Sequence, residues 1–214
     1  MDNLFRRLLF PAGKLVSKYV SPGQTVADLG CGPGFFTLPM ARILNDASAP
    51  SENRGKLYAI DFDPKSIEKL KTKATKQRLN DVMEIHVGSA SNLDFIPNFS
   101  VDFVLANGLL CCMHDHLGAV DEMKRILKLG GFAYLSITKL ARKNDPRSVT
   151  KNEWRQLLTA NFEVRGEGEG LLGMWAVVKP LYKETGRELV NGKNSQHKER
   201  KNLSSTCICN NPMS

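Results

Sequence analysis

One stretch decides how this chain folds: Val26-Ala27-Asp28-Leu29-Gly30-Cys31-Gly32-Pro33-Gly34-Phe35-Phe36-Thr37. It starts as a short apolar run, passes through three glycines at alternate positions and ends in residues typical of a helix. Glycines allow a tight turn and let a ligand lie directly on the backbone. A strand, a glycine turn and a helix in this order hold a nucleotide-like ligand in parallel α/β sheets. We expect the helix to begin near Pro33, with its free N–H groups facing a negative group.

Short apolar segments alternate with amphipathic ones along the rest of the chain. Strands are predicted at residues 25–29, 56–62, 82–87, 101–106, 132–137, 162–165 and 174–178. The last two have only a glycine-rich turn region between them, so we expect an antiparallel pair. The alternation before them predicts an α/β fold with a Rossmann-like, doubly wound, mostly parallel sheet and helices on both faces.

Capping residues mark where several helices begin or end. Asp63-Pro64 combines a good N-cap with a proline at the first helical position, which predicts a helix after the second strand. Thr150, followed three residues later by Glu153, is typical of another helix start. Leu129-Gly130-Gly131 is expected to stop a helix directly before the fifth strand.

Length and composition fit one globular domain with a tail. The 214 residues are 42% hydrophobic, which suits a chain with a sizeable core. We expect an N-terminal helical cap (1–20), a main domain (21–180) and a basic, polar, disordered tail (181–214). The formal net charge of +8 would allow contact with an acidic partner, but charge alone does not identify a substrate.

Membrane segments, disulfides and metal sites are not expected. No apolar run reaches the roughly 20 residues that span a bilayer. The apolar part of residues 1–10 is too short for a signal peptide. The five cysteines form no CxxC pair, which argues against a disulfide scaffold and against a structural zinc site. We therefore expect a cytoplasmic protein that holds no metal and does not contact a membrane.

Four features in chain order carry a resemblance to a known family: Asp28-x-Gly30-x-Gly32-x-Gly34, Asp61 at the end of the second strand, Gly88-Ser89-Ala90 after the third, and Leu127-Lys128-Leu129-Gly130-Gly131 before the fifth. Over residues 12–180 the chain resembles the small, single-domain class I S-adenosylmethionine (SAM)-dependent methyltransferases, of the type 11 and type 25 kind. This resemblance implies SAM as the cofactor. It also implies a seven-stranded sheet with an antiparallel last strand.

The resemblance assigns cofactor contacts to ten residues: Asp28, Gly30, Cys31, Gly32, Gly34, Asp61, Phe62, Ser89, Ala90 and Asn107. The glycines and the cysteine between them would bring the backbone to the methionine part of SAM, which Asp28 would also contact. Asp61 would accept hydrogen bonds from both ribose hydroxyls, and Phe62 would pack on the adenine face. Ser89 and Ala90 would lie at the adenine edge, although many relatives have Asp at the serine position. Asn107 would end the fourth strand, where cofactor and acceptor meet.

Some of these side chains have simpler alternatives. The alternative for Asp61 is a role as partner for the next helix turn, although its place beside the glycine turn favours ribose binding. The alternative for Cys31 is a small loop residue whose backbone alone meets the ligand. Asp63 is expected to be an N-cap rather than a ligand.

The acceptor side is predicted to be the segment after the fourth strand, residues 107–116. His114 and His116 are the candidate general bases, if the acceptor must lose a proton, and His114 is the one expected to face the acceptor. The alternative is that Asp115 caps the next helix and the histidines lie on the surface. Cys111 and Cys112 suggest a soft acceptor such as arsenite, against the simpler interpretation of two small buried residues.

Four functions remain in view at this point. A methyltransferase with a small-molecule acceptor is the main hypothesis, and a SAM-binding protein without catalysis is the second. A nucleic-acid or protein methyltransferase is a third. The Asn/Asp-Pro-Pro-aromatic sequence typical of amino-methylating nucleic-acid enzymes is absent, since the chain has Asn107-Gly108-Leu109-Leu110 at this position. A nicotinamide-dependent oxidoreductase is disfavoured by the glycine spacing and by the lack of a Tyr-x-x-x-Lys pair.

Overall fold

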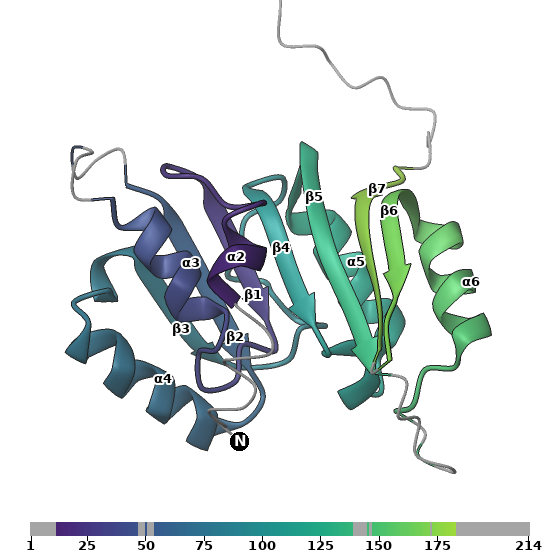
Figure 1. The fold of residues 1–214 in the computed structure, drawn as a ribbon, viewed down its shortest axis with the longest axis horizontal. Helices are drawn as coiled ribbons and strands as arrows, with labels where there is room; N and C mark the ends of the chain where they lie inside the picture. The colour runs from purple at the N-terminus through teal and green to yellow at the C-terminus, as the bar shows by residue number, and fades with distance from the viewer. Residues whose placement is uncertain are drawn as a thin grey trace, which may run out of the picture. The chain divides into compact units, whose positions relative to one another are not determined.

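The computed structural model describes residues 12–46, 50, 54–138, 145, 147–171 and 173–182. Their strands form one seven-stranded sheet with the order β3-β2-β1-β4-β5-β7-β6 (Figure 1). The strands are β1 (Thr25–Leu29), β2 (Lys56–Asp61), β3 (Met83–Val87), β4 (Val101–Asn107), β5 (Leu127–Thr138), β6 (Phe162–Glu169) and β7 (Gly173–Pro180). β7 pairs antiparallel with β5 and β6, and the other pairs are parallel. The predicted doubly wound sheet with an antiparallel last strand is confirmed.

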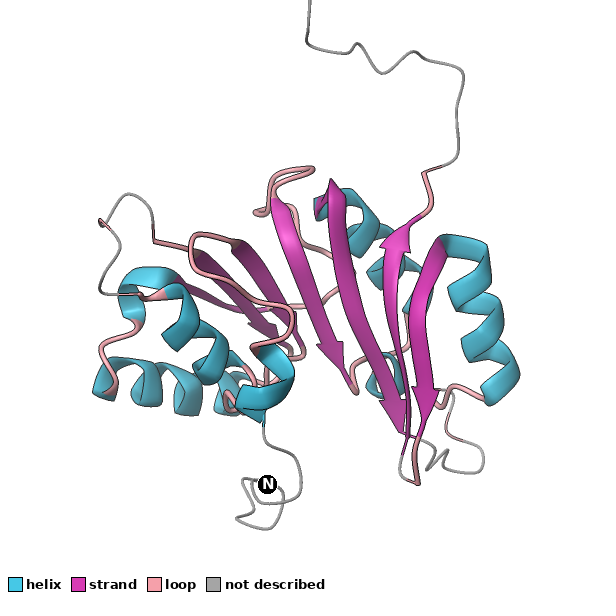
Figure 2. Cartoon of the chain, turned by 45° about the horizontal axis from the view of Figure 1, so that its top comes forward, coloured by secondary structure: helices cyan, strands magenta, loops and turns pink. Residues whose placement is uncertain are grey.

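Helices cover both faces of this sheet. They are α2 (Ala12–Val16), α3 (Thr37–Leu44), α4 (Pro64–Lys76), α5 (His116–Ile126) and α6 (Lys151–Asn161), with short 3₁₀ turns η2 (Asn80–Val82) and η3 (Leu110–Cys112). Val16 of α2 and the buried apolar side chains of α3 and α4 belong to one apolar cluster, and those of α5 and α6 to a second. Figure 2 shows helices on either side of the magenta strands. Successive β1 residues point to opposite clusters, Val26 to the first and Ala27 to the second, as strand geometry requires.

The helix after β2 begins as its capping residues predict. The Asp63 carboxylate accepts hydrogen bonds from the backbone N–H groups of Lys65 (3.1 Å) and Ser66 (3.2 Å), and Pro64 opens the helix. Three apolar side chains of α4 are buried: Ile67, Leu70 and Ala74. Most lysines of the same helix are exposed, but Lys73 is half-buried, and its Nζ donates to the Pro33 carbonyl at 3.0 Å. The cofactor-side end of α4 is fixed by a cap and by core packing.

The capping box of α6 gives a stability prediction. Thr150 accepts the Glu153 N–H at 3.3 Å, while the Glu153 carboxylate accepts the Thr150 N–H at 2.7 Å. Thr150→Ala is expected to lower the free energy of unfolding by about 1 kcal/mol, since it leaves a helix N–H without its acceptor. Urea denaturation measures this loss. Thr159→Ala is the matched control, because the Thr159 hydroxyl on the same helix donates only to carbonyls of the preceding turn. It should change the free energy of unfolding by less than about 0.5 kcal/mol. An equal loss in both variants would contradict the role of Thr150 as an N-cap.

Two predicted helix boundaries are wrong. The helix after the glycine turn begins at Thr37 rather than near Pro33, because Gly34 adopts a φ of +92° that no right-handed helix contains. Leu129-Gly130-Gly131 does not stop a helix: α5 ends at Ile126, and the glycines lie inside β5. They occupy the place where the pairing with β4 shifts register, and a Cβ on Gly131 would lie 3.0 Å from the Val101 carbonyl oxygen.

The ends of the chain are described only in part. Of the predicted cap at residues 1–20, residues 12–20 are described, and Val16 and Val20 are buried in the cluster that contains α3. Residues 1–11 and 183–214 lie outside the described residues, so only Leu181 and Tyr182 of the predicted tail are described. The Tyr182 hydroxyl donates to the Leu127 carbonyl at 3.0 Å. The chain divides into two units, residues 1–182 and residues 183–214. In the described part of the chain, no helix has both the length and the apolar character needed to cross a membrane.

Candidate active site

The glycine turn after β1 is held against the end of β2. The N–H groups of Gly30 and Cys31 both donate to the Ile60 carbonyl, at 2.8 and 3.0 Å. All three glycines of the motif have positive φ: +77° at Gly30, +53° at Gly32 and +92° at Gly34. A Cβ on Gly32 would point into open space, whereas one on Gly34 would lie 2.6 Å from a Leu70 side-chain carbon. The middle glycine therefore leaves room for a ligand, and the last one allows α4 to pack.

Asp61 faces the glycine turn. One carboxylate oxygen accepts the Gly32 N–H at 2.7 Å, and the other accepts the Asp63 N–H at 2.8 Å. The second bond shows that Asp61 also supports the turn into α4, which is the simpler alternative for this residue. Each oxygen retains a further lone pair, and the side chain is partly exposed. The next residue, Phe62, is 81% exposed, so an apolar ring stands in solvent beside a carboxylate.

Asp28 is a buried acid beneath the turn. It is 2% exposed, and its carboxylate accepts a hydrogen bond from the Thr37 hydroxyl at 2.6 Å. Burial raises the pKa of Asp28 to about 7, against the opposing effect of the Thr37 hydrogen bond. A cation brought to this carboxylate would favour its ionised form.

The cysteine of the turn is a packing residue in this structure. Cys31 is buried, and burial, together with the charges of Asp28 and Asp61, raises the pKa of its thiol above the ordinary range. A neutral thiol is a poor nucleophile. Any contact of Cys31 with a ligand would therefore use its backbone.

The segment after β3 lies next to the backbone of Asp61. The Gly88 N–H donates to the Asp61 carbonyl at 3.0 Å. The Ser89 hydroxyl shares a hydrogen bond with that of Ser91 at 2.8 Å. Ala90 is 5% exposed as a whole residue and belongs to the buried apolar cluster.

The end of β4 meets the turn from the other side. The Asn107 side-chain oxygen accepts a hydrogen bond from the Ser136 hydroxyl at 2.9 Å, and the Gly108 N–H donates to the Ser136 carbonyl at 3.0 Å. A Cβ on Gly30 would lie 3.1 Å from a Leu109 side-chain carbon. Asn107 and the glycine turn are thus brought to one edge of the sheet, where β1, β2 and β4 end (Figure 1).

The residues after β4 include the candidate base and the cysteine pair, and their exposure to solvent agrees only in part with the prediction. His114 is exposed, and Asp115 caps α5 by accepting the Gly118 N–H at 2.9 Å, as the simpler alternative stated. The same alternative is wrong for His116, which is half-buried, with its Nε2 buried and without a hydrogen-bond partner among the described residues. Cys111 is half-buried, with its thiol donating to the Gly108 carbonyl at 3.4 Å. Cys112 is exposed, so burial of both cysteines is wrong: the η3 turn places Leu110 in the core and Cys112 outside.

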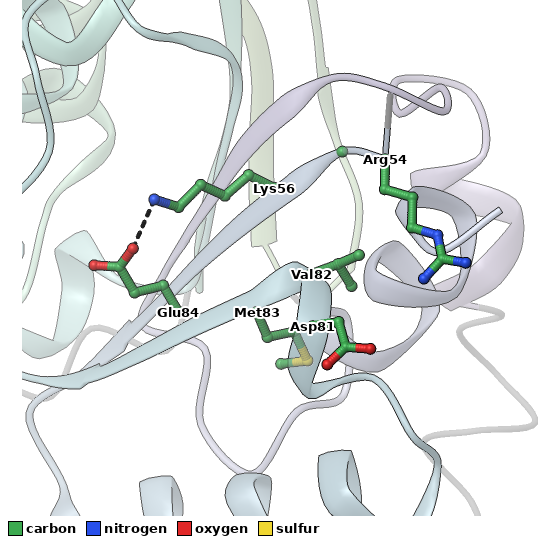
Figure 3. Close-up of a pocket in the computed structure, with 7 residues that line it drawn as sticks. Arg54, Lys56, Asp81, Val82, Met83 and Glu84 are labelled. Atoms are coloured by element: carbon green, nitrogen blue, oxygen red, sulfur yellow. Dashed lines mark ion pairs between the residues drawn. The ribbon is translucent and has the colours of Figure 1, made fainter. Parts of the chain in front are cut away.

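A hollow of about 580 Å³ lies at the opposite edge of the sheet, where β2 and β3 begin. Figure 3 shows Arg54, Asp81 and Met83 around it, and the Lys56–Glu84 ion pair of 2.7 Å closes one side. Ligands of open α/β sheets bind at the carboxyl ends of the strands, so this hollow is not the candidate site. Among the described residues, no group of three or more His, Cys, Asp or Glu side chains is arranged to hold a metal ion.

Two residues that hold site side chains in place could not be identified from a sequence motif. Thr37 holds Asp28, and Ser136 holds Asn107. Thr37 reads as an ordinary helix residue, and Ser136 as an ordinary residue of a buried strand. Only the strand register, which pairs Asn107 with Ser136, brings the second contact about.

The fold and this edge of the sheet define an α/β protein with a nucleotide-binding glycine turn. A family model described as "Methyltransferase domain" matches residues 27–135, and the chain belongs to this family, the class I SAM-dependent methyltransferases. SAM is the cofactor of the family. Within the described residues, the open space at Gly32, the exposed ring of Phe62, the carboxylate of Asp61 and the buried acid Asp28 fit such a group.

Relatives with curated names agree with this family. Demethylmenaquinone methyltransferases of Listeria monocytogenes and Staphylococcus epidermidis are 29% and 30% identical over 143 and 172 residues, covering 67% and 71% of this chain. Together with a bifunctional biotin biosynthesis protein of Teredinibacter turnerae, they are matched over 20% to 67% of their own lengths. The crystal structure of a SAM-dependent methyltransferase from Aquifex aeolicus superimposes with a TM-score of 0.70 at 21% identity, covering 84% of this chain and 95% of that one. That likeness supports the fold.

Proposed function

We propose that this chain transfers the methyl group of SAM to a small-molecule acceptor. The observation that carries the proposal is the position of the Asp61 carboxylate, 2.7 Å from the N–H of Gly32 in the glycine turn and next to the exposed ring of Phe62. A carboxylate and an aromatic face side by side suit a ribose and an adenine. Family membership supports the same cofactor.

Different residues would contact different parts of the cofactor. The backbone from Gly30 to Gly34 would meet the methionine part, and the carboxylate of Asp28 would approach its amino group. Asp61 would accept the ribose hydroxyls, Phe62 would stack on the adenine, and Ser89 and Ala90 would line its edge. Bound SAM supplies a methyl group on a positively charged sulfur. The chain's own contribution is then to orient the acceptor and exclude water, which in general supplies about 7–11 kcal/mol of a barrier.

The acceptor would be a small apolar molecule. Leu109, Cys111 and Met113, after the end of β4, are partly buried and pack against the core. The printed names of the relatives refer to a quinone-type acceptor, which supports an apolar ring for this chain as well. His114 stays the proposed base, to be tested by His114→Ala: methyl transfer that is unchanged in this variant would rule the base out.

Binding and transfer are tested separately. Titration calorimetry with SAM, S-adenosylhomocysteine and NAD should show binding of the two adenosyl compounds and none of NAD. Transfer of a radiolabelled methyl group is then measured with quinols and phenols, with RNA and with protein. Label in the small molecules supports the proposal. Label found only in RNA or protein would mean that the acceptor is a macromolecule and that the proposed small-molecule acceptor is wrong. SAM binding without any methyl transfer would mean that the chain is a SAM-binding protein without catalysis.

Asp61→Ala is expected to weaken SAM binding by about 10²–10⁴-fold. Two hydrogen bonds to a charged acceptor would be lost, each contributing about 1.5–3 kcal/mol. Calorimetry at constant pH measures the change. Asp63→Asn is the control, because Asn is also a good N-cap and the residue lies two positions away; its SAM affinity should stay within about threefold of the unmodified chain. Equal effects of the two substitutions would mean that Asp61 does not bind the ribose of SAM.

The domain boundaries at residues 20 and 180 and a cytoplasmic location remain predictions. We keep the helical cap (1–20) and the polar tail (181–214) as proposed units beside the main domain. Limited proteolysis followed by mass spectrometry tests the second boundary, since cleavage should concentrate after residue 180.

A further inference from the structure

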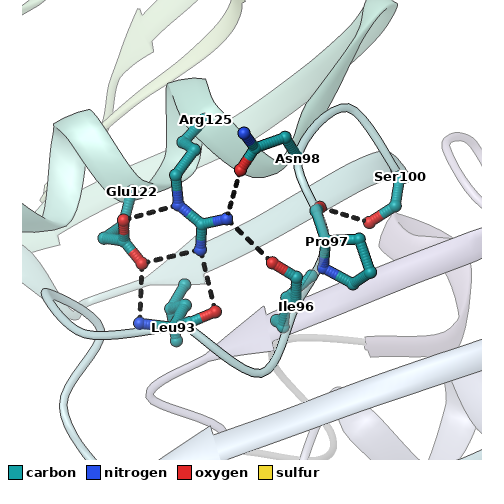
Figure 4. Close-up of polar contacts among 7 residues, drawn as sticks. All are labelled: Leu93, Ile96, Pro97, Asn98, Ser100, Glu122 and Arg125. Carbon is teal, nitrogen blue, oxygen red and sulfur yellow. Dashed lines mark hydrogen bonds and ion pairs between the residues drawn. The ribbon is translucent and has the colours of Figure 1, made fainter.

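Arg125 on α5 holds the loop that joins β3 to β4 (Figure 4). Its guanidinium donates to the Glu122 carboxylate through Nε at 2.7 Å and Nη2 at 2.9 Å. The other donors reach the carbonyl oxygens of Leu93 and Ile96, both at 2.8 Å, and the side-chain oxygen of Asn98 at 2.7 Å. Every N–H of the guanidinium therefore has an acceptor, and three of the five acceptors belong to the loop.

Glu122 completes what we call the Arg125–Glu122 clamp. Its carboxylate accepts the Leu93 N–H at 2.6 Å, so both backbone groups of Leu93 are bound by the clamp. The Arg125 hydrogen bonds hold the pKa of Glu122 below its usual range, which keeps the carboxylate charged at neutral pH. The Leu93 and Ile96 side chains are fully buried, so this part of the loop is fixed by polar and apolar contacts together.

The other end of the loop is fixed to the candidate site. The Gly88 N–H donates to the Asp61 carbonyl at 3.0 Å, and the Asn92 N–H donates to the Ser89 carbonyl at 3.1 Å, forming a turn. Ser89 and Ala90 therefore lie between an anchor at Asp61 and the clamp at Leu93. Four residues separate the two anchors, so a shift at the clamp would displace them.

We propose that Arg125 is a positioning residue for base recognition: through the clamp it sets Ser89 and Ala90 against the adenine edge of the cofactor. The inference rests on the proposed function, since it needs SAM in this site. Arg125 itself does not touch the cofactor. A site built to hydrogen-bond a ligand group rejects an analogue that lacks this group, and the Ser89–Ser91 hydroxyl pair lies in the segment between the two anchors.

Arg125→Lys tests the proposal, because lysine keeps the charge but cannot reproduce the planar fork of five donors. The probes are S-adenosylhomocysteine and S-inosylhomocysteine, which differ at the base, titrated calorimetrically below the unfolding temperature. The unmodified chain should prefer the adenine compound by about tenfold or more. Arg125→Lys should reduce this preference at least threefold or so. Arg165→Lys, in the exposed Arg165–Glu163 pair on β6, is the matched control and should leave the preference unchanged.

A second variant covers the case in which Arg125→Lys does not fold. Asn98→Ala removes one exposed contact of the clamp and should reduce the preference to a smaller degree, with faster hydrogen exchange of the Leu93 amide. A preference that is unchanged while thermal stability falls would make the clamp purely structural and overturn the inference. Equal binding of both probes by the unmodified chain would also overturn it. Binding of neither probe would instead refute the proposed function.

Discussion

Asp28→Asn is expected to stabilise the folded chain at pH 8 and, at the same time, to weaken SAM binding. Burial raises the pKa of Asp28 from 3.8 to about 7. The folded state thus retains a proton that the unfolded state releases above pH 3.8, and the free energy of unfolding falls as the pH rises from about 4 to about 7. Above pH 7 the charge is present in both states, and its burial costs at most about 4 kcal/mol. Asparagine does not ionise and can still accept the Thr37 hydrogen bond, so most of this cost should disappear.

Urea denaturation of Asp28→Asn at pH 4 and pH 8 measures the effect. The two proteins should be similar in stability at pH 4, and the variant should be more stable by about 2–4 kcal/mol at pH 8. SAM affinity should fall by roughly 10–100-fold, because a charged hydrogen bond to the amino group is lost. The unmodified chain should bind SAM more tightly as the pH rises from 6 to 8. Asp81→Asn, exposed at the far edge of the sheet, should show neither change; a variant no more stable than the unmodified chain at pH 8 would contradict the raised pKa.

Local patterns account for the parts of this structure that the sequence predicted correctly. The N-cap at Asp63 and the capping box at Thr150 each depend on residues within three positions of one another. The seven strands follow from alternation and apolar runs, and the approach of Asp61 to the glycine turn follows from strand ends meeting at one edge. The wrong boundaries, at Pro33 and at Gly130, lie where backbone angles and strand register depend on packing.

Side-chain contacts that depend on strand order and on helix orientation were beyond prediction. Asn107 and Ser136 lie 29 positions apart, and Arg125 and Leu93 lie 32 apart. Such pairs depend on the strand order and on which face of α5 meets the sheet. Neither is encoded in a short motif, so the residues that hold the candidate site are less visible in the sequence than those that line it.

Gly32 and Gly34 should respond differently to substitution, although the sequence motif does not distinguish them: Gly34 is needed for packing, and Gly32 leaves space for the ligand. Gly34 has a φ of +92°, and a Cβ there would lie 2.6 Å from Cδ1 of the fully buried Leu70 and 3.1 Å from Cγ of Leu38. Gly34→Ala is therefore expected to lower the free energy of unfolding by about 3–5 kcal/mol, from backbone strain and overpacking together. Gly32 has a φ of +53° and open space around the missing Cβ, so Gly32→Ala should cost only about 1–2 kcal/mol.

The effects on SAM affinity should be the reverse of the effects on stability: Gly32→Ala should weaken SAM binding more than Gly34→Ala does. The methyl group of Gly32→Ala would stand in the space proposed for the ligand, and the Gly32 N–H lies beside Asp61, so binding should weaken about tenfold or more. Gly34→Ala, assayed at a temperature where it stays folded, should bind within about threefold of the unmodified chain, because its added methyl group points toward α4 and away from the ligand. Urea denaturation and calorimetry on both variants provide the four numbers. Normal SAM binding by Gly32→Ala would mean that the cofactor does not lie over this turn, and the proposed site would then have to be abandoned even if the family is right.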